Sequence, residues 1–194
     1  MAVSATAVLL YENFCLFEIS VALSVLSQGK KKFITCSPSG RPLLSEEGIE
    51  VVPRCTLFDL DPTSCDSLLL PGASDIRSAI EDPHVLAFVR AFQNKPIGAI
   101  SIAPLLLVKA GIMGQRRWMA GVNRQELMEE GFSEESVTGM VDWNELQTSP
   151  IPEGYLLEDG VLTSVAYHFV PFGVKFGEMV GAMDSIRDYT GSLP

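Results

Sequence analysis

Strand and helix patterns alternate through the first 110 residues, and this alternation restricts the chain to few folds. Short apolar runs typical of buried strands occur at residues 5–11, 67–70 and 96–101. Residues 17–26 and 85–92 instead carry apolar side chains at helical spacing. A strand that is followed by a helix and another strand predicts a parallel pair with the helix on the face of the sheet. We therefore predict an α/β fold with a mostly parallel sheet and helices on both faces.

Several local signals refine this prediction. Residues 32–37 alternate as a second strand, and residues 40–53 form a hairpin-like excursion marked by Pro42 and Gly48. Asp82 before Pro83 is a helix start, because a capping side chain precedes a first-turn proline. A further helix is predicted from Pro104 to Ala110, where Gly111 ends it.

The pattern changes after residue 111. Asn123 and Glu126 predict a capping box for a short helix ending near Glu130. Residues 133–153 are polar and are expected to be irregular. Asp159-Gly160 predicts a β-hairpin turn, and a last helix carries its apolar side chains on one side. These side chains are Phe172, Phe176, Met179, Val180 and Met183.

Length and charge restrict the organisation of the chain and its partners. The 194 residues are 47% hydrophobic and contain no repeat or linker-like tract, so we predict one domain over residues 1–194. A net charge of −10 argues against nucleic acid and anionic membranes as partners. The basic run Lys30–Lys32 is too short to change this, and we interpret it as a solvated turn between a helix and a strand.

The cysteines and histidines indicate a reducing compartment and no metal site. The N-terminal apolar run is short and lacks a basic flank, so it is interpreted as a first strand rather than a signal peptide or membrane span. The four cysteines show no CxxC spacing, which indicates buried thiols in a cytoplasmic protein. Two histidines far apart in the sequence argue against a metal centre. We expect no cofactor.

The predicted sheet places a ligand site at the carboxyl ends of its strands. Three segments converge there, namely the loop after Tyr11, the turn at Pro71-Gly72-Ala73 and the turn at Ser101. Ser101 lies between an apolar strand and the helix that begins at Pro104, which is the position where such a fold presents a nucleophile.

These segments together resemble the ThiJ/PfpI superfamily, the group that contains the parkinsonism-associated deglycase and intracellular proteases. The resemblance extends from "AVLLYENFCLFEIS" through "DSLLLPGAS" and "PIGAISIAP" to "LEDGVLTSV". It implies a flavodoxin-like, doubly wound, single-domain fold of the class I glutamine amidotransferase type, and a homodimer. It also implies that Glu18 is the site carboxylate, that Gly72 and Ala73 form the glycine turn, that Ser101 is the elbow residue, and that Ile102 contacts ligand.

The sequence departs from the family at the elbow itself. Members commonly carry cysteine where this chain has Ser101, and some place a histidine directly after it, where this chain has Ile102. Other members have a histidine downstream, near the positions of Ala120 and Gly121. A cysteine is activated when its pKa, ~8.5 in the free state, is lowered. A serine hydroxyl instead requires a base within hydrogen-bond reach.

Two residues are candidates for that base. Glu18 is a weak one, because a solvated carboxylate has a pKa of ~4.3 and burial leaves it protonated more often. Its interpretation as a surface carboxylate in a first helical turn stays open beside the pocket role. His168 ends "GVLTSVAYHFVP", loosely like the catalytic histidine of class I amidotransferases, but position 170 is valine where an acid normally follows. The favoured interpretation of His168 is instead a histidine that caps a strand or lines an interface.

Three hypotheses follow. The leading one is a family member without thiol catalysis that binds a small polar metabolite at Glu18 and Ser101. Backbone N–H groups at Gly72 and Ala73 are expected to help hold a ligand oxygen. The second is a hydrolase or amidotransferase-like enzyme that depends on Ser101 with His168 as base. The third is a stress-related chaperone or interaction module, which requires an exposed apolar patch.

Overall fold

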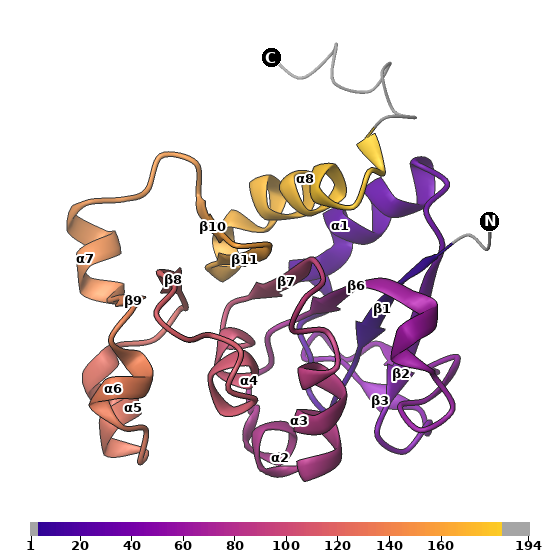
Figure 1. The fold of residues 1–194 in the computed structure, drawn as a ribbon, viewed down its shortest axis with the longest axis horizontal. Coiled ribbons are helices and arrows are strands. Elements are labelled where there is room, and N and C mark those ends of the chain that lie inside the picture. The colour runs from indigo at the N-terminus through magenta and orange to yellow at the C-terminus, as the bar shows by residue number, and fades with distance from the viewer. Residues whose placement is uncertain (1–3, 184–194) are drawn as a thin grey trace.

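A seven-stranded sheet runs through the centre of the computed structural model, which describes residues 4–183 (Figure 1). The strand order is β10-β11-β7-β6-β1-β2-β5, and every neighbouring pair is parallel except β10 and β11. The strands are β1 (Ala5–Leu9), β2 (Phe33–Ser37), β5 (Cys55–Thr56), β6 (Cys65–Leu70), β7 (Ile97–Ile100), β10 (Tyr155–Glu158) and β11 (Val161–Ser164). The predicted mostly parallel sheet is confirmed. The two ends of the predicted domain, residues 1–3 and 184–194, lie outside the described residues.

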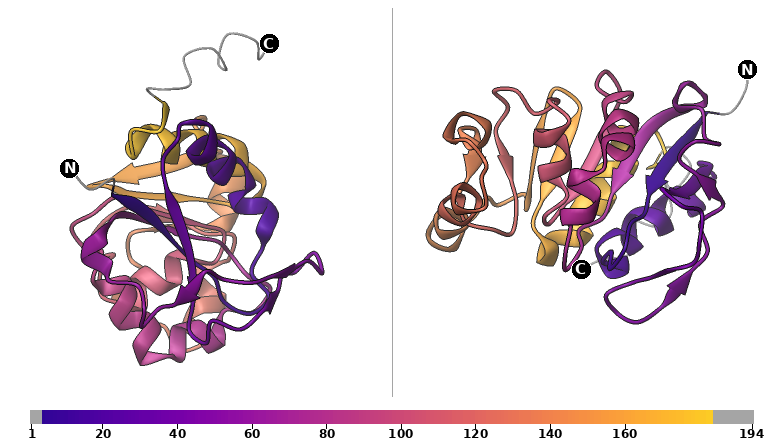
Figure 2. Two further views of the ribbon diagram at one scale, coloured as in Figure 1. Left: turned by 90° about the vertical axis from the view of Figure 1, so that its right-hand side faces the viewer. Right: turned by 90° about the horizontal axis from the view of Figure 1, so that it is seen from below.

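Helices cover both faces of this sheet, as the sequence predicts. Helices α1 (Leu16–Gln28) and α8 (Phe169–Met179) lie together on one face. Helices α2 (Arg77–Glu81), α3 (Pro83–Arg90) and α4 (Pro104–Lys109) lie on the other (Figures 1 and 2). The Asp82 side chain accepts the His84 N–H at the start of α3, so the predicted cap is confirmed. A mostly parallel sheet with helices on both faces confirms the predicted flavodoxin-like, doubly wound fold.

The apolar side chains predicted within residues 17–26 divide between two faces of helix α1. Val21 and Val25 lie against α8, where a Cβ on Gly173 would meet Val21 at 2.8 Å and one on Gly177 would meet Val25 at 2.2 Å. The glycines of α8 therefore allow the two helices to pack closely. A second face turns toward the sheet, and its fully buried apolar residues are Ile19, Ala22 and Leu26.

The excursion between β2 and β5 is the predicted hairpin. Its strands β3 (Leu43–Leu44) and β4 (Glu50–Val51) pair antiparallel. A single-turn helix, η1 (Pro62–Ser64), leads from this region into β6. The Asp159-Gly160 turn between β10 and β11 also has the predicted form, since both residues have positive φ, 46° and 80°.

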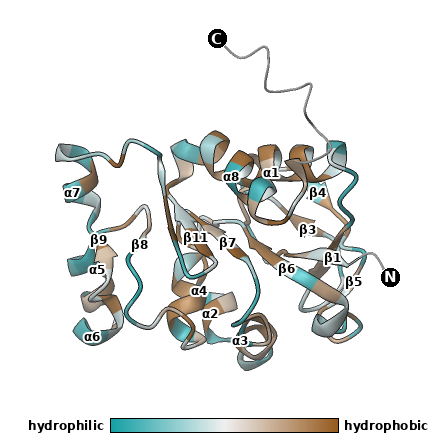
Figure 3. Cartoon of the chain, turned by 45° about the horizontal axis from the view of Figure 1, so that its top comes forward, coloured by the Kyte–Doolittle hydropathy of each residue, from teal (hydrophilic) through white to brown (hydrophobic). Residues whose placement is uncertain are grey.

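Residues 133–153 are ordered into short elements, so the expectation of an irregular segment is wrong. They contain α6 (Glu134–Val137), β9 (Met140–Val141) and α7 (Trp143–Thr148), and β9 pairs with β8 (Trp118–Met119). The predicted capping box begins α5 (Arg124–Glu129). These short elements bury one or two apolar side chains each while their outer faces stay polar, as Figure 3 shows for α6 and α7. Apolar and polar residues alternate over too few positions in these elements to show a helical or strand period in the sequence.

No helix among residues 4–183 has the length and apolar character needed to cross a membrane.

A second short helix, η2 (Ala166–His168), lies in the connection between β11 and α8. Because β1, β6, β7 and β11 are parallel, their carboxyl ends and the loops that follow them lie along one edge of the sheet.

Candidate functional site

Ser101 occupies a sharp turn between β7 and α4. Its φ of +62° lies in the left-handed region, which costs a residue with a side chain about 1–2 kcal/mol. Hydrogen bonds on both sides hold it there: the Ser101 N–H donates to Ser164 O at 2.8 Å, and the Gly121 N–H donates to Ser101 O at 3.4 Å. A strained residue between a strand and a helix is the geometry of a nucleophile elbow. The Ser101 side chain is partly exposed.

Glu18 and Gly72 lie directly against Ser101. The Gly72 N–H donates to Glu18 Oε2 at 2.6 Å. A Cβ on Gly72 would lie 2.5 Å from Glu18 Oε2 and 2.9 Å from Ser101 Oγ, so both oxygens approach the same point of the turn. The fold therefore brings together three predicted site residues from α1, the turn after β6 and the turn after β7.

Burial makes Glu18 titrate near neutral pH. The side chain comes from the first turn of α1 but only 1% of its surface is exposed, so its interpretation as a surface carboxylate is wrong. Burial raises its pKa to about 7, although the Gly72 N–H, the Ser101 hydroxyl and the Cys15 thiol each act to lower it. Near pH 7 the group is therefore a mixture of a hydrogen-bond-donating acid and an accepting carboxylate.

The turn at Gly72 is held on several sides by the loop after β1. The Tyr11 hydroxyl donates to Pro71 O, while the N–H of the same peptide bond donates to Glu18. The Cys15 N–H donates to Gly72 O at 2.8 Å. Of the two predicted backbone donors, the Gly72 N–H is thus already used by Glu18. The Ala73 N–H has no hydrogen-bond partner among residues 4–183, which leaves it available to a ligand.

Tyr11 was not identified from the sequence as a site residue. Its side chain is buried, and its pKa is raised by burial and by the nearby Glu18 carboxylate and Cys15 thiol. It therefore remains a neutral donor to Pro71 O. The sequence around Tyr11 resembles the end of an apolar strand and does not indicate this hydrogen bond, because the acceptor lies in a turn sixty residues further along the chain.

Cys15 is adjacent to the site but is not a replacement nucleophile. Its thiol donates to Glu46 Oε2 at 2.6 Å. Burial, that hydrogen bond and the neighbouring carboxylates Glu18, Glu46 and Glu47 all raise its pKa far above the ordinary value. The thiolate is therefore disfavoured, and Cys15 is buried, as the sequence analysis expects of the cysteines.

The excursion also caps the helix that carries Glu18. Glu47 Oε1 accepts the Phe17 N–H at 2.9 Å and Glu47 Oε2 accepts the Leu16 N–H at 3.2 Å. Cys15, at the N-cap position, supplies no side-chain cap of its own. A carboxylate at this end of a helix is favoured by the exposed N–H groups and by the helix dipole. The hairpin thus helps to position Glu18, a role that the sequence analysis missed.

His168 is held by a different set of groups. A Cβ on Gly154 would lie 3.0 Å from its Nδ1, and its ring lies 4.4 Å from that of Tyr167. Nδ1 is buried and accepts or donates no hydrogen bond within residues 4–183. The hydrogen bonds described for those residues join no histidine to Ser101. Ile102, the other predicted contact, is half-buried and packs on the core.

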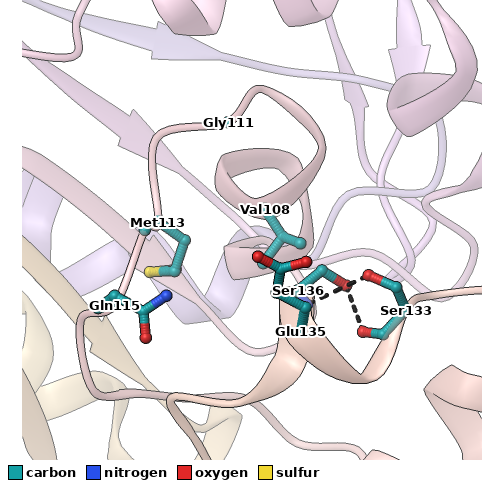
Figure 4. A pocket seen from close by; sticks show the side chains of 8 residues that line it. Val108, Gly111, Met113, Gln115, Ser133, Glu135 and Ser136 are labelled. Atoms are coloured by element: carbon teal, nitrogen blue, oxygen red, sulfur yellow. Dashed lines mark hydrogen bonds between the residues drawn. The ribbon is translucent and has the colours of Figure 1, made fainter.

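Neither Glu18 nor Ser101 lines any of three cavities found in the described part of the chain. One of about 290 Å³ is found at the far end of α4, where Figure 4 shows Val108, Gln115 and Glu135 around it. The Ser136 hydroxyl there donates to Ser133 O at 2.7 Å, and the Ser136 N–H donates to Ser133 Oγ at 3.2 Å. A second cavity, of about 190 Å³, is lined by residues that include Tyr11, Leu43 and Asp82, and a third, of about 580 Å³, is lined by residues that include Lys30 and Arg54. No cluster of three histidine, cysteine or acidic side chains able to hold a metal ion occurs among residues 4–183.

One family model matches most of the chain. The sequence model of the DJ-1/PfpI family matches residues 5–157, which include Glu18, Gly72 and Ser101. A comparison with curated proteins found no match.

Solved structures share the fold at low sequence identity. The chain is similar to DJ-1beta of Drosophila melanogaster, with 17% identity, a TM-score of 0.76, and coverage of 95% of this chain and 94% of that one. A DJ-1 superfamily protein of Agrobacterium tumefaciens has 18% identity and a TM-score of 0.75, with 92% and 90% covered. Schizosaccharomyces pombe DJ-1 has 16% identity and a TM-score of 0.73, with 98% and 100% covered.

Proposed function

The chain belongs to the DJ-1/PfpI family, and we propose that it binds a small polar metabolite at Glu18 and Ser101 without the thiol catalysis of cysteine-bearing members. The observation that carries this proposal is the position of Ser101. It keeps the strained elbow conformation and lies against a buried carboxyl, yet it presents a hydroxyl in place of a thiol.

The groups around Ser101 suit an uncharged acceptor oxygen. Protonated Glu18 can donate to the Ser101 oxygen, which leaves the Ser101 hydroxyl free to donate to a ligand, and the Ala73 N–H is a second donor. A carbonyl or amide oxygen fits this set, whereas a carboxylate ligand would be repelled by the ionised fraction of Glu18. We therefore favour a metabolite that carries a carbonyl or amide group.

The same arrangement opposes nucleophilic catalysis by Ser101. The carboxyl hydrogen-bonded to its hydroxyl is that of Glu18, whose pKa of about 7 is far below that of an alcohol. The rival enzyme hypothesis requires His168 to come within about 3 Å of Ser101, directly or through one water. The contacts of His168 with Gly154 and Tyr167 give that movement no support.

Turnover and binding assays on the purified protein test this proposal. The wild type and Ser101→Ala are offered dicarbonyls, amides and isonitriles, and we expect neither to turn any of them over. We expect a binder from the panel to lose about tenfold in affinity in Ser101→Ala, since a hydrogen-bond donor to its oxygen is removed. Turnover by the wild type that disappears in Ser101→Ala would refute the proposal, and its loss in His168→Gln would establish the rival.

We further propose a cytoplasmic homodimer. All four cysteines, which lie within residues 4–183, are free thiols, and this supports a reducing compartment. The excursion exposes large apolar side chains at Leu44, Ile49 and Val52, which a second copy of the chain would cover. Light scattering on the purified protein is expected to give twice the 21.1 kDa chain mass, and a mass of one chain would contradict the dimer.

A further inference from the structure

A basic groove lies at the edge of the sheet opposite to Ser101. The cavity measures about 580 Å³ and is lined by Ala5, at the start of β1, and by Phe33 and Ile34, at the start of β2. Because β1, β6 and β7 are parallel, these strand starts lie at the other end of the sheet from the turns at Gly72 and Ser101. The groove is therefore separate from the candidate site.

Four of the fourteen lysines and arginines of the chain line this groove. They are Lys30, Lys31, Lys32 and Arg54, and Ser27 adds a hydroxyl. Lys31 pairs with Asp66, but Lys30, Lys32 and Arg54 form no ion pair within residues 4–183. A cluster of like charges repels itself, and this one persists in a chain whose net charge is −10.

The solvated turn inferred from the sequence explains only part of this cluster. Lysines that follow the last residue of α1 are favoured there by the negative end of the helix dipole. Arg54 comes from the connection between β4 and β5, and its N–H is bound to Thr35 O at 3.0 Å. Arg54 therefore reaches the groove from a separate part of the chain, and the dipole of α1 does not account for its position there.

We propose that this groove binds a small polyanion that carries two or more phosphate-like charges beside an apolar or planar group. Guanidinium and ammonium groups are the donors that proteins use for phosphate oxygens. Phe33 and Ile34, both half-buried, provide an apolar wall next to those charges. The volume lies within the range of pockets for small molecules.

Isothermal titration calorimetry with inorganic triphosphate, ATP and AMP tests the groove. We expect triphosphate to bind with a dissociation constant below about 1 mM at 50 mM salt. The affinity is expected to fall at least tenfold at 300 mM salt, because surface charge interactions are screened. ATP is expected to bind more tightly than triphosphate through the apolar wall, and AMP more weakly than either.

Variants locate the binding. Lys32→Ser and Arg54→Ser are each expected to weaken triphosphate binding at least tenfold, while Arg41→Ser leaves it unchanged. Arg41 is the matched control because it is exposed and does not line the groove. Absence of heat at millimolar triphosphate, unchanged affinity in Arg54→Ser, or equal loss in Arg41→Ser would overturn the proposal. ATP that binds no more tightly than triphosphate would overturn the role of Phe33 and Ile34.

Discussion

Glu18→Gln will remove a pH dependence of stability that amounts to about 3 kcal/mol in the wild type, because burial raises the pKa of Glu18 from 4.5 to about 7. Between these pH values the folded protein holds a proton that the unfolded chain has released. The contribution of Glu18 is therefore complete below pH 4.5 and is lost as the pH rises through 7. A glutamine has no proton to lose, so the variant becomes progressively more stable than the wild type above pH 5.

Urea unfolding of both proteins at pH 4.5, 6, 7 and 8 measures this effect. The difference in the free energy of unfolding is expected to change by about 3 kcal/mol in favour of Glu18→Gln between the lowest and highest pH. Glu153→Gln, at an exposed carboxyl, is the control and is expected to show a constant difference. A difference between Glu18→Gln and wild type that stays constant with pH would show that Glu18 is not buried against the turn.

Gly72→Ala is expected to destabilise the fold and to separate Glu18 from Ser101. The new Cβ would lie 2.5 Å from Glu18 Oε2 and 2.6 Å from Ser101 Cβ, distances that real Cβ atoms do not adopt. Neither neighbour has free space, since Glu18 is buried and Ser101 is held by backbone hydrogen bonds on both sides. Overpacking of this kind costs about 1–3 kcal/mol, and the Glu18 contact with the Gly72 N–H is lost with it.

Gly121→Ala provides a matched control for that substitution. Gly121 also belongs to the site region, because its N–H donates to Ser101 O, but a Cβ there would meet nothing within 4 Å. Chemical denaturation is expected to show a loss of stability for Gly72→Ala, with no loss for Gly121→Ala. Equal stability of the two variants would mean that the turn at Gly72 has more room than the structure gives it.

The sheet could be predicted from the sequence because its strands and caps carry local signals. Apolar runs ending at Leu70 and Ile100 identify buried strands, and Asp82 before Pro83 identifies a helix start. The elements between residues 133 and 153 were missed for the opposite reason. A helix of four residues such as α6 completes barely one turn, so it presents no period. A usable signal was present at Asp142 and Glu145, whose capping box begins α7.

The candidate site was predictable only as far as the family resemblance extends. That resemblance paired Glu18 with Gly72 and Ser101, and the structure places them in contact. The left-handed φ of Ser101 could not be predicted from the sequence, since a glycine indicates such a conformation but a serine does not. Glu47 was missed because it acts on a helix thirty residues earlier in the chain, and no local pattern encodes such a contact.

Intact-mass spectrometry after treatment with a fluorophosphonate, a reagent that forms a covalent bond with activated serines, tests the central claim most directly. If no neighbouring base removes the proton of the elbow hydroxyl, the mass of the protein is unchanged after prolonged exposure at pH 8. A mass increase that maps to Ser101 and is absent from Ser101→Ala would show that this alcohol is activated, and would contradict the account.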